Sequence, residues 1–154
     1  MIDTPRIVKT TAQLAAIIRI TVPREEIRAV MGPGLSELQV AVAEQGIPTA
    51  GPWFTHHLRM DPGVFDFEIG IPVSRRFSAA SRARPGELPA ARVVRTVYHG
   101  DYEGLGSAWQ HVDAWIVANG HLPGPDLWEV HLTGPESTSN PADWRTELNK
   151  PIIS

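Results

Sequence analysis

An internal repeat constrains the fold of this 154-residue chain more than any other feature of its sequence. The segment GIPTAGPWFTHHL begins at Gly46 and GHLPGPDLWEVHL begins at Gly120, and the same spacing of 74 positions relates His57 to His131. Further along, FEIGIPV (67–73) and TELNKPI (146–152) each carry a Glu four residues before a Pro. The chain is therefore expected to contain one structural unit twice.

Local patterns at the start of each copy predict a strand followed by a helix. In the first copy, residues 6–22 are rich in β-branched side chains and predict an extended segment, bent around 11–13. A helix is expected next, with Pro33 in its first turn and Gly46 directly after its end, over an apolar stripe at helical spacing: Leu35, Leu38 and Val42.

The second copy repeats this order. Residues 91–99 predict a strand, and a helix ending at Asn119-Gly120 carries the apolar stripe Leu105, Trp109, Val112 and Ile116. Two more strands are expected after each helix, with a turn at 61–63 in the first copy: residues 53–60 and 64–73, then 127–132 and 145–152.

These elements predict one α+β domain, residues 1–154, made of duplicated βαββ units with approximate two-fold symmetry. The first repeat is expected at about 5–74 and the second at about 91–153, with the Pro/Gly/Arg-rich segment 75–90 as the linker. Helices are expected to cover one face of the antiparallel strands. The opposite faces would then be free to form a ligand cleft between the halves.

Composition narrows the class of protein further. A hydrophobic content of 42% and a net charge of −3 predict a folded domain with its own core, and the absence of cysteine excludes disulfides and thiolate metal sites. The N-terminus has no signal-peptide pattern, and no apolar run approaches membrane-spanning length. A soluble cytoplasmic protein without a membrane partner is expected.

An arginine cluster between residues 75 and 95 raises the possibility of phosphate binding. Its only acid is Glu87 and its only aromatic is Phe77, and no helix-turn-helix or zinc-finger pattern accompanies it: Arg75, Arg76, Arg82, Arg84, Arg92 and Arg95. A solvated linker explains these arginines better, so no direct nucleic-acid binding is expected.

The stretch HGDYEGLGSAW, residues 99–109, looks at first like a phosphate-binding loop. It lacks the Gly-Lys-Ser/Thr ending of a Walker loop and the GxGxxG spacing of a dinucleotide site. Asp101 instead suits the cap of a helix, and the glycines allow a tight entry into it. The histidines do not have metal-ligand spacing either, so neither a metal nor a cofactor is expected.

Three segments between residues 88 and 152 resemble a known protein family. Residues 88–120 (LPAARVVRTVYHGDYEGLGSAWQHVDAWIVANG), followed by WEVHLTGP (128–135) and WRTELNKPI (144–152), resemble the GyrI-like domain, which is also the effector-binding domain of AraC- and MerR-type regulators. The resemblance implies a duplicated βαββ fold with a small-molecule pocket between the halves. It also implies that ligands are lipophilic and often cationic, and that a subset of relatives hydrolyses strained cyclopropane rings.

One departure from the family pattern concerns the candidate site. The family has Glu-x-Tyr on the strand after the second helix, whereas this chain has Glu129-Val130-His131. No DNA-binding module is recognised beside the domain, so a self-contained transcription factor is not expected.

Strand alternation divides the residues around Glu129 between two faces. Glu129 and His131 share one face and are expected to line the cleft, whereas Trp128, Val130 and Leu132 are expected to pack under the helices. A carboxylate among aromatic rings can neutralise a cation or act as a base. Repeat equivalents and nearby aromatics complete the candidate ligand-binding residues: Glu129, His131, Thr55, His57, Trp53, Trp109, Tyr102, Glu147 and Trp144.

The sequence therefore predicts a stand-alone protein that senses or sequesters a hydrophobic, cationic or planar compound. The first alternative is a hydrolase that opens strained electrophiles, with Glu129 as general base and His131 as a second catalytic residue. The second is a protein-binding inhibitor of the gyrase-inhibitor type. Glu68 and Glu147, which are equivalent in the repeat, are expected to share a structural role near a strand end.

Overall fold

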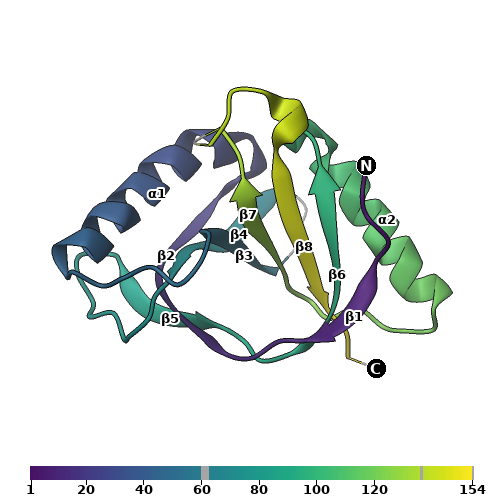
Figure 1. Cartoon of the computed structure of the whole chain (residues 1–154), viewed down its shortest axis with the longest axis horizontal. Coiled ribbons are helices and arrows are strands. Elements are labelled where there is room, and N and C mark those ends of the chain that lie inside the picture. Colours follow the sequence, from purple (N-terminus) through teal and green to yellow (C-terminus); the bar gives the residue numbers. More distant parts are fainter. Residues whose placement is uncertain (60–62, 136, 154) are drawn as a thin grey trace. The chain divides into compact units, whose positions relative to one another are not determined.

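The structure is a computed structural model that describes residues 1–59, 63–135 and 137–153. Its α+β class agrees with the sequence prediction, and its strands pair antiparallel (Figure 1). The chain divides into two compact units. Unit 1 comprises Met1–Thr10 and Ala91–Ser154, and unit 2 comprises Thr11–Ala90.

Unit 2 is a four-stranded sheet in the order β3-β4-β2-β5, with one long helix. Its elements are β2 (Gln13–Pro23), the 3₁₀ turn η1 (Arg24–Glu26), α1 (Ile27–Glu44), β3 (Phe54–Arg59), β4 (Val64–Pro72) and β5 (Arg84–Leu88).

Unit 1 has the matching arrangement, with the strand order β1-β6-β8-β7. Its elements are β1 (Arg6–Lys9), β6 (Arg92–His99), η2 (Tyr102–Gly104), α2 (Leu105–Ala118), β7 (Leu127–Thr133), η3 (Pro141–Asp143) and β8 (Arg145–Pro151).

The duplicated βαββ order is confirmed down to strand register. His57 faces Phe67 across β3 and β4, and His131 faces Thr146 across β7 and β8; a bulge follows directly after each histidine. Both helices end where expected, because Gly46 and Gly120 follow them in the left-handed conformation, with φ of 64° and 78°.

The copies differ by one helical turn. The starts of the helices, Ile27 and Leu105, are 78 positions apart, whereas the histidines of β3 and β7 are 74 apart. The difference lies in the helices, since α1 has 18 residues and α2 has 14. Four residues are close to one turn, so the extra length keeps the same face of α1 toward its sheet.

Two expectations about element boundaries need correction. Helix α1 begins at Ile27, so Pro33 lies inside it rather than in its first turn. The segment 75–90 is more than a linker, because residues Arg84–Leu88 form β5 and pair with β2. The turn expected at 61–63 involves residues outside the described part of the chain.

The bend near residues 11–13 separates two strands that belong to different units. Strand β1 precedes the bend and pairs with β6 in unit 1, whereas β2 follows it and belongs to unit 2. Conversely, β5 immediately precedes the second copy but pairs with β2 in unit 2. The short edge strand of each unit therefore comes from the segment that precedes the other unit's βαββ copy in the chain. Strand β1 lies before the first copy but pairs in unit 1, and β5 lies before the second copy but pairs in unit 2.

Each unit has its own apolar core between helix and sheet. In unit 2, α1 packs through Leu38 and Val42 onto Ile18, Phe67 and Ile69. In unit 1 the core residues are Val94, Tyr98, Ala108, Val112, Ile116 and Leu148. No described helix is long and apolar enough to cross a membrane.

Candidate functional site

Glu129 and His131 lie on the face of β7 that carries α2. Glu129 is opposite Leu148 in the β7–β8 register, and Leu148 packs in the core with α2. His131 is likewise opposite Thr146, two residues earlier on β8, and therefore lies on the same face. Glu129 and His131 therefore share a face, as expected, but it is the helix-covered face of the sheet and not the helix-free face on which the cleft was expected.

The expectation that Trp128, Val130 and Leu132 pack under the helices is wrong. Trp128 is opposite Asn149 in the β7–β8 register, on the face away from α2, although its side chain is only 2% exposed. Alternation separates the two faces of a strand but does not say which one the helix covers. The apolar character of the set favoured the helix-covered face, but α2 instead packs over the face of Glu129 and donates a hydrogen bond to it through Trp109.

Trp109 positions the carboxylate of Glu129. Its indole Nε1 donates a hydrogen bond of 2.7 Å to Glu129 Oε2. Trp109 is on α2, one turn after Leu105, and both side chains pack against the unit 1 core. The indole thus packs its apolar ring against the core and donates its N–H to the half-buried carboxylate of Glu129 in a short, charge-assisted hydrogen bond.

Three rings form an aromatic cluster on the same part of unit 1. The ring of Tyr102 is tilted over Trp144, with centroids 5.1 Å apart, and meets His131 edge-on at 5.9 Å. Trp144 is fixed by its Nε1, which donates to the Thr138 carbonyl at 3.0 Å. Tyr102, Trp144 and His131 are therefore ordered by different elements, namely η2, the segment before β8, and β7.

The start of α2 explains the glycine-framed stretch noticed in the sequence. Asp101 accepts a hydrogen bond from the Glu103 amide at 3.1 Å, which confirms its role as a cap. A Cβ at Gly104 would collide with the Tyr98 hydroxyl, so this glycine permits the close approach of Tyr98. Both features place Tyr102 at the entrance to the helix, beside Trp144.

Sequence reasoning missed Thr146. Its side chain is fully buried on β8, opposite both Tyr98 and His131. Among the described residues, its hydroxyl has no hydrogen-bond partner. A threonine inside a strand is ordinary for its β-branched shape, so the sequence alone held no signal of this polar atom.

Glu147 does not join the group around Glu129. It is opposite Val130 and thus lies on the face away from α2. There it accepts a hydrogen bond of 3.1 Å from Asn149 and lies 3.4 Å from the Arg95 guanidinium. In unit 2 the equivalent Glu68 lies 3.8 Å from His56, and burial raises the pKa of Glu68. Glu147 therefore has an ion-pair partner, and Glu68 a neighbouring imidazole, within its own sheet.

The remaining candidates belong to unit 2. Thr55 and His57 lie on the α1 face of β3, opposite the core residues Ile69 and Phe67. His57 is 5% exposed, and burial lowers its pKa to about 4, with further lowering by His56 and Arg24. Trp53 packs against the unit 2 core. No group of three or more potential metal-ligating His, Asp or Glu side chains occurs within residues 1–59, 63–135 and 137–153.

One comparison with known proteins identifies a family. A family model described as "GyrI-like small molecule binding domain" matches residues 3–152. No curated protein sequence matches the chain.

Solved structures share the fold at low sequence identity. The C-terminal domain of EcmrR is 19% identical, with a TM-score of 0.86 and 98% of each chain covered. In a complex of EcmrR with DNA, the present chain spans 57% of the length of EcmrR, with the same TM-score of 0.86. SAV2435 bound to tetraphenylphosphonium is 10% identical, with a TM-score of 0.73 and coverage of 99% and 95%. A hydrolase encoded by lin2189 from Listeria innocua is also 10% identical, with a TM-score of 0.66 and coverage of 97% and 91%.

Proposed function

The chain belongs to the GyrI-like family of small-molecule-binding domains, and from this premise we propose that it binds hydrophobic compounds that are cationic or planar. The observation that carries the proposal is the carboxylate of Glu129 held at 2.7 Å by Trp109. The aromatic cluster of Tyr102, His131 and Trp144 lies on the same unit.

The chemistry of this group suits a delocalised organic cation. Glu129 supplies the negative charge, and the faces of Tyr102 and Trp144 attract a cation through their quadrupoles. A soft, poorly hydrated cation loses little hydration when it leaves water, so aromatic contact and a single carboxylate are sufficient to hold it. A strongly hydrated metal ion would need more oxygen ligands.

Tetraphenylphosphonium, which SAV2435 binds, is a suitable probe. Titration into the wild-type protein is expected to quench tryptophan fluorescence, because Trp109 and Trp144 lie in the proposed site. Glu129→Gln keeps the shape of the side chain and removes its charge, so affinity should fall by at least about tenfold, or 1.4 kcal/mol. Circular dichroism checks that the variant remains folded.

Glu147→Gln is the matched control, because this carboxylate lies on the opposite face of the same sheet. It is expected to bind the phosphonium with wild-type affinity. Equal losses in both variants would mean that overall charge, rather than the site at Glu129, governs binding. Absence of binding to the wild-type protein would refute the proposal for this class of cation.

A second candidate function is hydrolysis of a strained, electrophilic cyclopropane. Glu129 and His131 lie on one face of β7, and the fold is shared with the lin2189 hydrolase. In this reaction Glu129 removes a proton from water as the water oxygen attacks the electrophilic ring carbon. The ring bond breaks, and its electron pair is taken up by the leaving carbon framework, which is then protonated. In this proposal His131 supplies that proton.

Turnover of a cyclopropane-containing alkylating agent, followed by chromatography, tests this second function. Glu129→Gln is expected to slow the reaction by ~10²–10⁴-fold, the usual contribution of general-base catalysis. His131→Phe should slow turnover and alter its pH profile. Substrate that disappears no faster with wild-type protein than with Glu129→Gln would leave simple binding as the function.

A further inference from the structure

The repeat places a counterpart of the unit 1 cluster in unit 2. Arg24 is the first residue of η1, as Tyr102 is of η2, and each turn leads directly into a helix. Phe65 precedes the His57 partner Phe67 by two positions, just as Trp144 precedes the His131 partner Thr146. Arg24, His57 and Phe65 thus occupy the places that Tyr102, His131 and Trp144 hold in unit 1.

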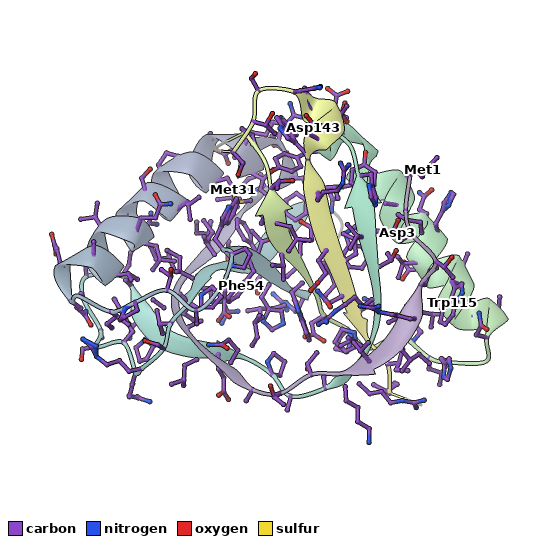
Figure 2. All side chains as sticks on the ribbon, viewed as in Figure 1. Met1, Asp3, Met31, Phe54, Trp115 and Asp143 are labelled. Carbon is purple, nitrogen blue, oxygen red and sulfur yellow. The ribbon has the colours of Figure 1, made fainter. Side chains whose placement is uncertain are left out.

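The contacts of the counterpart cluster are equally well defined. The Arg24 guanidinium carbon lies 4.3 Å from the centroid of the Phe65 ring. His57 meets Phe65 edge-on at 5.5 Å and stacks on Phe67 at 5.3 Å with an interplanar angle of 22°. Met31 on α1, at the position matching Trp109 when the helix starts are aligned, packs against the same core (Figure 2).

The charge of the cluster is inverted between the two units. Thr55 replaces Glu129 at the equivalent strand position, and Arg24 replaces the neutral Tyr102. The acids of β4 point elsewhere: Asp66 pairs with Arg19, and Glu68 lies beside His56 on the other face. Glu25 and Glu26 follow Arg24 in the chain, but Arg24 forms no ion pair with any described residue.

Two polar groups of this cluster therefore have unused hydrogen-bonding capacity. The exposed guanidinium of Arg24 lies over the Phe65 ring, and its N–H groups are not used in an ion pair with any described residue. Nδ1 of His57, a residue that is 5% exposed, has no hydrogen-bond partner in the part of the chain that the structure describes. A planar guanidinium fork matches the two oxygens of a carboxylate.

We propose that Arg24, His57 and Phe65 form a second binding site in unit 2, selective for an aromatic carboxylate. The carboxylate accepts hydrogen bonds from the guanidinium of Arg24, and its ring packs against the apolar edges of Phe65 and Met31. The cation site proposed for unit 1 and this anion site then differ in sign because the repeat diverged at Arg24 and Thr55. The second site does not depend on the function proposed for Glu129.

Titration of the full chain with 1-naphthoate, followed by two-dimensional NMR of backbone amides, tests the site. The probe is expected to shift the signals of Arg24, His57 and Phe65, whereas the matched cation 1-naphthylmethylammonium should not. Arg24→Gln should weaken 1-naphthoate binding by at least about tenfold, and Arg24→Lys by an intermediate factor, since it keeps the charge but loses the planar fork. The same spectra report whether each variant is folded.

Arg28→Gln is the control for charge, because Arg28 is exposed on the first turn of α1 and undergoes the same loss of one positive charge. It should bind 1-naphthoate as the wild-type protein does, and so should Glu129→Gln. The proposal is overturned if millimolar 1-naphthoate leaves the three signals unmoved, or if Arg28→Gln weakens binding as much as Arg24→Gln.

Discussion

At the scale of single residues, the hydrogen bond between Trp109 and Glu129 is expected to contribute to stability as well as to the proposed binding. Glu129 lies on the sheet face that packs against α2, where a carboxylate loses part of its hydration. Removing a donor from a partly buried charged acceptor costs more than a neutral hydrogen bond contributes, because the desolvated charge remains. The stability of unit 1 is therefore expected to depend on the hydrogen bond that Trp109 donates to the carboxylate of Glu129.

This coupling predicts the behaviour of Trp109→Phe, which keeps an aromatic ring but removes the N–H. The free energy of unfolding, from urea titration followed by circular dichroism, is expected to fall by about 1–3 kcal/mol. Adding Glu129→Gln should recover part of that loss, because no charge is then left without its donor. Trp115→Phe on the same helix is the control for ring replacement. Strictly additive effects of Trp109→Phe and Glu129→Gln would contradict the coupling.

Single residues also show how far the sequence predicts the site. Alternation, the repeat and the family resemblance select Glu129, His131 and the nearby aromatics as candidates, because these signals are carried along one chain. The partnership of Trp109 with Glu129, and the contact of Arg24 with Phe65, depend on contacts between elements. No local pattern encodes such contacts, and for the same reason the sequence does not indicate which face of β7 the helix covers.

At the scale of elements, α1 is unusual in carrying Gly32, Pro33 and Gly34 in its interior. Pro33 has no N–H to donate to the carbonyl four residues earlier, which normally ends a helix, so the sequence suggested a helix start there. The helix continues because its apolar face is buried: Leu38 and Val42 pack into the unit 2 core. Tertiary packing thus overrides local propensity in this element.

The two glycines of α1 are predicted to respond differently to alanine. Apart from its chain neighbours and its own helix, a Cβ at exposed Gly32 meets nothing within 4 Å, so the gain in helix propensity from Gly32→Ala, about 0.5–1 kcal/mol, is opposed only by the contact of the new methyl group with Pro33. A Cβ at buried Gly34 would lie 2.7 Å from Ile69 Cδ1 and 3.3 Å from Ile20 Cδ1. Gly34→Ala should therefore be less stable than Gly32→Ala by about 1 kcal/mol or more. Thermal unfolding of both variants measures this, and equal stability would contradict the close contact of α1 with its sheet.

At the scale of the whole molecule, the two copies of the repeat have the same fold but carry different charges at equivalent positions. The added turn of α1 and the matching bulges after His57 and His131 keep equivalent positions on equivalent faces. Sequence similarity between copies could reveal this order. It could not reveal the exchange of β1 and β5, because strand pairing between distant segments leaves no mark on local periodicity.

The free energy of unfolding at acid pH is a property of the whole molecule, and three titrating residues of unit 2 are expected to affect it: His57, Asp66 and Glu68. Burial holds the pKa of His57 at about 4, below its ordinary 6.5, so the unfolded chain binds more protons in this interval. The free energy of unfolding must then decrease as the pH falls from 6.5 to 4. Asp66 acts in the same direction at lower pH: hydrogen bonds from Arg19 lower its pKa below 3.8, and this stabilisation is lost as the carboxylate becomes protonated. The raised pKa of Glu68 has the opposite effect.

His57→Phe isolates the first contribution, because it removes the titrating group and leaves a ring that can stack on Phe67. Urea unfolding of the wild-type protein at intervals between pH 6.5 and 4 should show a loss of stability that is smaller in the variant by about 3 kcal/mol. The background slope from Glu68 and other groups is common to both proteins and cancels in this difference. If His57→Phe loses stability as steeply as the wild-type protein, the imidazole of His57 is not the buried neutral group that its packing against Phe65 and Phe67 requires.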